Sequence, residues 1–250
     1  ALLWAAGAAF CVLTGVGLSR GLLSREPPCS DGGETLVGVW DARVQQAVRR
    51  AFVAANPAVA EYRFLRLTRS LDAYTADLRA THLDVCQATR VRREQSDTMF
   101  DLRTACLDRR RQELGAFTVL VAAGVDAPTM DRAVGSALDL VPVSVCSDKK
   151  ALAEILPPPD DPARRKEVEA AVERVDGVRA LDRLGRYAEA LALAEEIVAG
   201  ARSLDHPPLL AEALDALAHL QLGNGDGKRA EATLHEAVRA ATRAHDDARV

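Results

Sequence analysis

The stretch Gly185-Arg186-Tyr187-Ala188-Glu189-Ala190 decides the interpretation of the last third of this 250-residue chain. A related stretch, Gly225-Asp226-Gly227-Lys228-Arg229-Ala230, follows it, and Ala190 and Ala230 stand 40 residues apart. In each stretch a glycine-containing turn leads into a run of small and large apolar residues at helical spacing. The sequence therefore predicts two helical hairpins within residues 164–250.

Both stretches resemble the G-x-Y-x-E-A core of tetratricopeptide repeats (TPRs), whose usual period is about 34 residues. Small residues at a helix crossing let paired helices approach closely, and leucines fill the remaining volume. The positions expected to interlock are Tyr187, Ala190, Ala194 and Ile197 in the first unit and Leu214, Leu217, Ala218, Ala230, Leu234 and Ala237 in the second. Because about three units are needed to bury a continuous face, we expect the array to run past Val250.

In TPR proteins the first helix of each unit lines a concave groove that binds a protein or peptide. The resemblance implies six charged contact residues in such a groove, which are Arg179, Asp182, Arg183, Glu212, Asp215 and His219. The alternative is a solvated charged face without a ligand. The glycine-rich run 223–228 is not predicted to be a phosphate loop, because Arg229 replaces the required Ser or Thr and no strand precedes it.

The composition indicates an all-α protein, since 48% of residues are hydrophobic but only 4% are aromatic. A net charge of −4 gives no broad positive field for phosphate backbones, so nucleic acid is not an expected partner. The proline-rich residues 157–163 predict a linker between the repeats and a domain at residues 29–156.

That domain is predicted to be a four-helix bundle. Apolar residues recur at helical spacing in four runs, within residues 37–52, 59–78, 99–120 and 130–138. Asn56-Pro57, the residues around 92–96, and Gly124 separate the runs. Short connections favour an up-down-up-down arrangement.

Four cysteines in this domain, Cys29, Cys86, Cys106 and Cys146, admit three disulfide pairings. In an even-numbered bundle the chain enters and leaves at the same end, which favours Cys29 with Cys146. Cys86 and Cys106 are equidistant from residue 96 and can meet across the turn. This nested pairing would place the domain in an oxidising, extracytoplasmic space. The alternatives are reduced buried cysteines, or a zinc site of His82, Cys86 and Cys106 that lacks an evident fourth ligand.

Residues 1–20 are predicted to form a transmembrane helix. Residues 1–19 carry no charge, and about 19 residues at about 1.5 Å each approach the hydrocarbon thickness of a bilayer. A signal peptide and a buried core helix are the alternatives. Arg20 and Arg25 follow the segment, which by the positive-inside rule would favour a cytoplasmic remainder, opposite to the side that the disulfides favour.

A string of short motifs resembles the region after the kinase domain in large membrane-bound serine/threonine protein kinases of myxobacteria and related bacteria. The motifs are Gly38-Val39-Trp40-Asp41, Leu71-Asp72-x-Tyr74, Cys86-x-Ala88-Thr89-x-Val91-Arg92, Glu94-Gln95-Ser96 and Asp101-Leu102-Arg103-x-x-Cys106-Leu107. In that family a cytoplasmic kinase domain, one transmembrane helix, a cysteine-bearing helical domain and a TPR array follow one another. The chain departs from the family pattern at Arg93, where Gly is usual, and at Thr104, where Met is usual.

The resemblance implies a non-catalytic sensing and protein-interaction portion of an inner-membrane kinase, with the bundle and repeats in the periplasm. ATP and Mg²⁺ would bind only in a kinase domain upstream, because the Gly-rich, V-A-I-K, H-R-D and D-F-G motifs are absent here. The alternatives are a membrane-anchored TPR scaffold without a kinase domain and a soluble cytoplasmic TPR regulator.

Charged residues at the tip of the bundle are a further candidate site for a sensed ligand. They are Arg92, Glu94, Asp101 and Arg103. The alternative is local structure, in which the charges pair across the turn and Ser96 or Asp97 caps the third helix.

Overall fold

The structure is a computed structural model that describes residues 29–245, and this part of the chain is helical without strands. The predicted all-α class is thus confirmed for the described residues. No helix among them is long and apolar enough to cross a membrane. The predicted transmembrane helix, residues 1–20, lies outside the described part.

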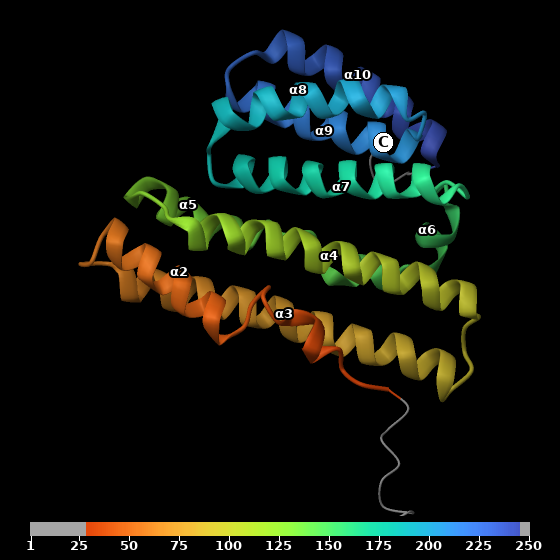
Figure 1. Ribbon diagram of the computed structural model, residues 1–250, viewed down its shortest axis with the longest axis horizontal. Coiled ribbons are helices and arrows are strands. Elements are labelled where there is room, and N and C mark those ends of the chain that lie inside the picture. The colour runs from red at the N-terminus through yellow and green to blue at the C-terminus, as the bar shows by residue number, and fades with distance from the viewer. Residues whose placement is uncertain (1–28, 246–250) are drawn as a thin grey trace, which may run out of the picture.

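The four predicted runs of the N-terminal half form four consecutive helices. Their bounds are α2 Ala42–Ala55, α3 Ala60–Arg90, α4 Asp97–Ala123 and α5 Ala127–Ser136. Ser96 accepts a hydrogen bond from the backbone N–H of Met99, so it is the N-cap of α4 as predicted, and Asp41 and Asp126 cap α2 and α5 in the same way. The long helices α3 and α4 form a hairpin along the long axis of the molecule (Figure 1).

The C-terminal half consists of two antiparallel hairpins. They are formed by α7 Pro162–Arg183 with α8 Tyr187–Ser203, and by α9 Pro207–Gly223 with α10 Gly227–Ala244. Short elements complete the described chain: the 3-10 helices η1 Gly33–Leu36 and η2 Val143–Ser147, and α6 Lys149–Glu154.

The turns inside the two hairpins are equivalent at an offset of 40 residues. Gly185 and Gly225 have φ values of 74° and 83°, a region that glycine adopts without steric cost. The hydrogen bond from Arg186 N to Leu181 O, 2.9 Å, recurs as Asp226 N to Gln221 O, 2.8 Å. The period read from the sequence is therefore a period of backbone geometry as well.

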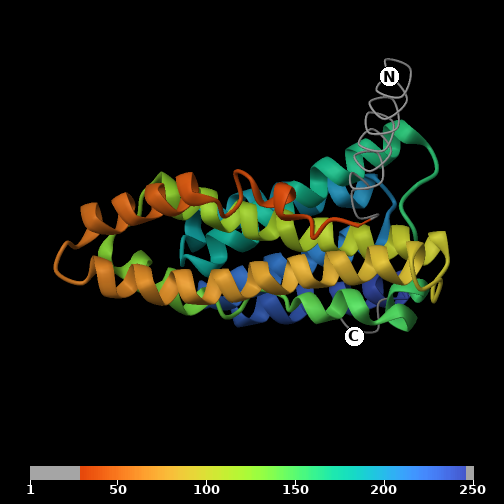
Figure 2. The same cartoon turned by 90° about the horizontal axis from the view of Figure 1, so that it is seen from below.

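The helices stack in layers, and α7 lies between α4 of the N-terminal half and the other helices of the C-terminal half (Figure 1). Seen from below, α3 runs most of the length of the molecule beside α2 (Figure 2). Ala180 of α7 and Leu184, which directly follows this helix, belong to the hydrophobic core of α2 to α5, whereas Val175 and Val178 belong to the core of α8 to α10. The proline-rich segment predicted as a linker thus joins two halves whose hydrophobic cores both include residues of α7. Its last proline, Pro162, is the first residue of α7.

Several residues predicted to interlock or to line a helix face are exposed. Leu234 is 37% exposed, so it does not fill the space between α9 and α10 as expected, whereas Ala230 and Ala237 are buried there. Tyr62 and Leu138, which are among the apolar residues of the runs 59–78 and 130–138, are 60% and 72% exposed. Helical spacing alone overstates the width of the buried face.

Candidate functional site

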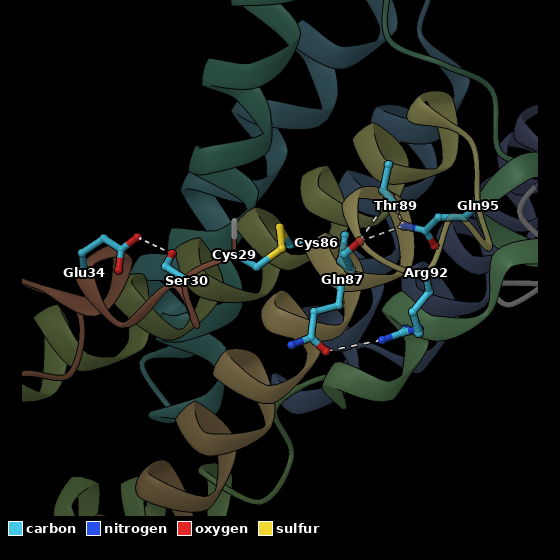
Figure 3. The surroundings of a disulfide bond; sticks show 9 residues. Cys29, Ser30, Glu34, Cys86, Gln87, Thr89, Arg92 and Gln95 are labelled. Atoms are coloured by element: carbon cyan, nitrogen blue, oxygen red, sulfur yellow. Dashed lines mark hydrogen bonds between the residues drawn. A yellow bond between two sulfur atoms is a disulfide. The ribbon is translucent and has the colours of Figure 1, made fainter. Parts of the chain in front are cut away.

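Two disulfides staple irregular segments onto the α3–α4 hairpin. One joins Cys29 to Cys86, with a Cα–Cα distance of 5.7 Å (Figure 3). The other joins Cys106 to Cys146, with a Cα–Cα distance of 5.5 Å. The four cysteines are therefore disulfide-bonded, but the predicted nested pairing is wrong. The zinc alternative loses both of its thiolates.

The pairing prediction failed on the direction of the side chains and on the length of α5. Cys86 directly follows the core residue Val85, and Cys106 directly precedes the core residue Leu107. One position on a helix is a rotation of about 100°, so both cysteines point away from the centre of the core. They point toward different neighbours, Cys86 toward the N-terminal segment and Cys106 toward η2. Helix α5 has only 10 residues, so the chain returns along η2 and brings Cys146 to α4.

At the tip of the hairpin, Arg103 is 2% exposed and fully engaged. Its Nε donates to the carbonyl of Cys146, its Nη1 to Gln95 Oε1 and its Nη2 to Asp84 Oδ2, each at 3.0 Å. Burial raises the pKa of Asp84, but the hydrogen bonds and charges of Arg103 and Arg92 outweigh it and leave that pKa below its ordinary value. Arg92 also bonds Glu94 at 2.8 Å. Arg92, Glu94 and Arg103 of the predicted tip set thus hold the tip and η2 in place, which favours the structural alternative over a ligand site, whereas Asp101 is exposed and takes no part in these bonds.

Other residues of the motif string also make structural contacts. The indole N–H of Trp40 donates to Asp72 Oδ1 at 2.8 Å, and the hydroxyl of Tyr74 donates to the carbonyl of Val141 at 3.0 Å. Gln95 Nε2 donates to Thr89 Oγ1 at 2.8 Å (Figure 3). These bonds join the turn before α2 to α3, α3 to the segment after α5, and the tip turn to α3.

A cavity of about 930 Å³ lies where α4, α5, α6, α7 and α9 meet. Five of the six predicted groove residues line it, namely Arg179, Asp182, Arg183, Asp215 and His219. The bundle contributes Arg110, Glu113 and Arg132, and an apolar wall consists of Val141, Val145, Leu152, Ile155 and Ala216. The site is thus built by both halves of the molecule.

Glu113 is the most enclosed charge of the cavity, at 0% exposure. Its carboxylate lies 2.9 Å from Arg110 and 2.6 Å from Arg183, which come from α4 and α7. Burial raises the pKa of Glu113, but the two guanidinium groups outweigh it and hold the pKa below its ordinary value. The triad therefore carries one negative and two positive charges.

A second chain of ion pairs connects α4, α7 and α9 next to the cavity. Arg109 lies 2.9 Å from Asp176 and 2.5 Å from Glu212, and Arg179 lies 3.4 Å from both Glu212 and Asp215. Burial raises the pKa of Asp176 to about 6, because the charge of Arg109 only partly offsets it. Glu212, predicted as a groove contact, instead bonds an arginine of the bundle and does not line the cavity.

Several polar groups of the cavity lack a hydrogen-bond partner in the described part of the chain. Arg110 Nε and Arg183 Nη1 are buried and unpartnered. The carboxylate of Asp182 has no hydrogen bond or ion pair there, and burial raises its pKa, with nearby His219 and Arg183 acting in the opposite direction. By contrast, Arg132 is engaged, since its Nη1 donates to the hydroxyl of Tyr187 at 3.0 Å. Within residues 29–245 no group of three His, Cys, Asp or Glu side chains is arranged to hold a metal.

Sequence reasoning missed the contribution of α4 to this site. Arg103 and Arg110 lie on the same helical stripe as Leu107, Leu114 and Phe117, which are all buried. A charge on an apolar stripe signals a buried ion pair, and that signal was present in the sequence.

Comparison with known proteins supplies no template for the site: no protein-family model matches the chain, and no curated protein or solved structure matches it.

Proposed function

We propose that this chain is the non-catalytic sensing and protein-interaction portion of a transmembrane serine/threonine protein kinase. The observation that carries the binding role is the cavity of about 930 Å³, on which charged residues of α7 and α9 converge. Surface charges are usually solvated singly, whereas concave sites with a few convergent polar groups are typical of ligand binding. The kinase assignment rests on the motif string.

The two C-terminal hairpins are proposed to be TPR-type repeats that bind a protein or peptide partner. The equivalent turns at Gly185 and Gly225 and the buried Ala190 and Ala230 support this assignment. Because two units bury only a short face, the array is proposed to continue past Val250.

Partner binding is tested by a photo-crosslinking amino acid at His219, whose side chain is 59% exposed beside the cavity. The same probe at Glu231, exposed on α10, is the matched control. The proposal expects one polypeptide to crosslink from position 219 only, and the purified polypeptide to lose at least about tenfold in affinity on Asp215→Ala. Equal crosslinking from both positions, or unchanged affinity, contradicts it.

The bundle and repeats are proposed to lie in the periplasm, anchored in the inner membrane by residues 1–20. The two disulfides support an oxidising compartment. Thiol titration of protein isolated from its native cells under acid-quenched conditions tests this placement. Blocked Cys29, Cys86, Cys106 and Cys146 are expected, and four reactive thiols would instead favour a cytoplasmic TPR regulator.

The kinase assignment is tested by the coding sequence upstream of Ala1. A G-x-G-x-x-G loop, an H-R-D loop and a D-F-G motif are expected there, and they would place ATP and Mg²⁺ in that domain. Upstream sequence that lacks these motifs would favour the second candidate, a membrane-anchored TPR scaffold.

A further inference from the structure

We infer that the cavity binds a small zwitterion of the amino-acid type, a free amino acid or a very short peptide. Its carboxylate would bind Arg110 and Arg183, its ammonium group would bind Asp182, and its aliphatic part would pack on the apolar wall. The inference deepens the sensing half of the proposed function and rests on the same cavity.

The anion-binding side of the cavity is the triad of Arg110, Glu113 and Arg183. One carboxylate serves two guanidinium groups, so one positive charge remains unmatched. The side chain of Arg110 is only 8% exposed, and its Nε has no partner. Nη1 of Arg183 is also buried and unpartnered. Guanidinium N–H groups without acceptors beside a cavity favour a carboxylate ligand.

The cation-binding side is Asp182, the residue next to Arg183 on α7. Asp215, which lines the same cavity from α9, already pairs with Arg179 at 3.4 Å and with His219 at 3.5 Å. Asp182 has no such ion pair among the described residues, although burial penalises its charge. A ligand ammonium group would supply the missing partner.

The two unmatched sides belong to one cavity, since Asp182 and Arg183 both line it and the charge of Arg183 is near enough to lower the pKa of Asp182. A ligand that satisfies both needs opposite charges separated by only a few bonds, as in an α-amino acid. The cavity lining contains four arginines and five carboxylates, a mixture that suits an overall neutral ligand better than a simple anion or cation. Val141, Leu152 and Ile155 provide the apolar surface for an aliphatic side chain. The volume falls within the range of about 300–1,000 Å³ for small-molecule sites.

The experiment is titration calorimetry of the full chain in detergent with the twenty amino acids, followed by charge-deleted analogues of the tightest ligand. For leucine these analogues are 3-methylbutylamine, which lacks the carboxylate, and 4-methylpentanoate, which lacks the ammonium group. We expect at least one aliphatic amino acid to bind and both of its analogues to bind at least about tenfold more weakly.

Two variants complete the test. Asp182→Asn should weaken amino-acid binding at least about tenfold while leaving the unfolding midpoint close to that of the native chain. Glu189→Gln, at an exposed position of α8, should change neither. Absence of binding by all twenty amino acids, equal binding of either analogue, or an unchanged affinity of Asp182→Asn overturns the inference. Partner crosslinking from position 219 is measured separately, so the inference can fail while the proposed protein-interaction role stands.

Discussion

Two buried arginines on α4 face opposite situations. Arg103 at the tip of the hairpin donates from Nε, Nη1 and Nη2 to three different acceptors. Arg110, two turns further along the same helix, pairs with Glu113, which it shares with Arg183, and its Nε has no partner. The sequence contexts are similar, but the second arginine lines the cavity between the two halves.

The difference separates a structural charge from one available to a ligand. A buried polar network stabilises a fold when all its members are satisfied, and an unsatisfied member costs free energy. Arg103 ties η2 to α4 next to the Cys106–Cys146 disulfide, so its bonds serve the fold. Arg110 and Arg183 both bond Glu113, but Arg110 Nε and Arg183 Nη1 lack a partner beside the cavity, which is the pattern expected where a ligand completes the network.

The largest expected effect comes from Arg103→Met. The substitution removes the donor to Gln95 Oε1, to Asp84 Oδ2 and to the carbonyl of Cys146, while Arg92 still bonds Asp84 Oδ1. The three hydrogen bonds to the buried guanidinium group are worth about 1.5–3 kcal/mol each, and less for the half-exposed Asp84, so the free energy of unfolding should fall by about 3–5 kcal/mol. Urea denaturation followed by circular dichroism measures this loss.

Arg92→Met is the matched control at the same tip. Arg92 bonds the same carboxylate, Asp84, but from an exposed position, so its loss should be far smaller than that of Arg103. Equal losses of unfolding free energy for the two variants would mean that the burial of Arg103 adds nothing to stability. Arg103 could then no longer serve as the structural counterpart of Arg110.

An intermediate effect is expected from Asp176→Asn, and it should depend on pH. Burial raises the pKa of Asp176 from 3.8 in the unfolded chain to about 6. Between these values the native state binds a proton that the unfolded state has lost, so ionisation at neutral pH costs up to about 3 kcal/mol. Asparagine carries no such cost. The stability of the native chain relative to Asp176→Asn should therefore rise by up to this amount as the pH falls from 7.5 to 4.

Urea denaturation of both chains at several pH values gives that difference, and other titrating groups cancel because they are common to the two. Glu189→Gln, at an exposed site, should show a nearly constant difference over the same range. A constant difference for Asp176→Asn as well would mean that Arg109, 2.9 Å away, fully compensates burial.

The sequence predicted the helices well because each one carries local signals. Asp41, Ser96 and Asp126 cap helix starts, and Gly185 and Gly225 end α7 and α9 in turns that need positive φ. The sequence did not predict the disulfide pairing, because pairing depends on the direction in which Cys86 and Cys106 leave their helices and on the path after α5. Those are tertiary properties.

The sequence predicted the part of the candidate site that α7 and α9 contribute, but not the part that α4 contributes. The TPR resemblance pointed to five residues of α7 and α9 that line the cavity, including Asp182 and His219. It did not predict that α4 would close the site, because the repeat pattern contains no information about a preceding bundle. Glu212 is an example, since the resemblance predicted it as a groove contact, but it bonds Arg109 of α4 at 2.5 Å.

The smallest effect is expected from Arg183→Met, and it tests the comparison most directly. Glu113 keeps Arg110 at 2.9 Å after the substitution, and the triad loses its excess positive charge together with the unpartnered Nη1. The loss in unfolding free energy should therefore be about 1.5 kcal/mol, the low end for a hydrogen bond to a charged group and well under that of Arg103→Met, because Arg110 still neutralises the buried carboxylate. Urea denaturation of the two variants in parallel measures the ratio. If Arg183→Met costs as much as Arg103→Met, the cavity arginines are held for the fold in the same way as the tip arginine, and unmatched N–H groups no longer distinguish a binding site from a structural one.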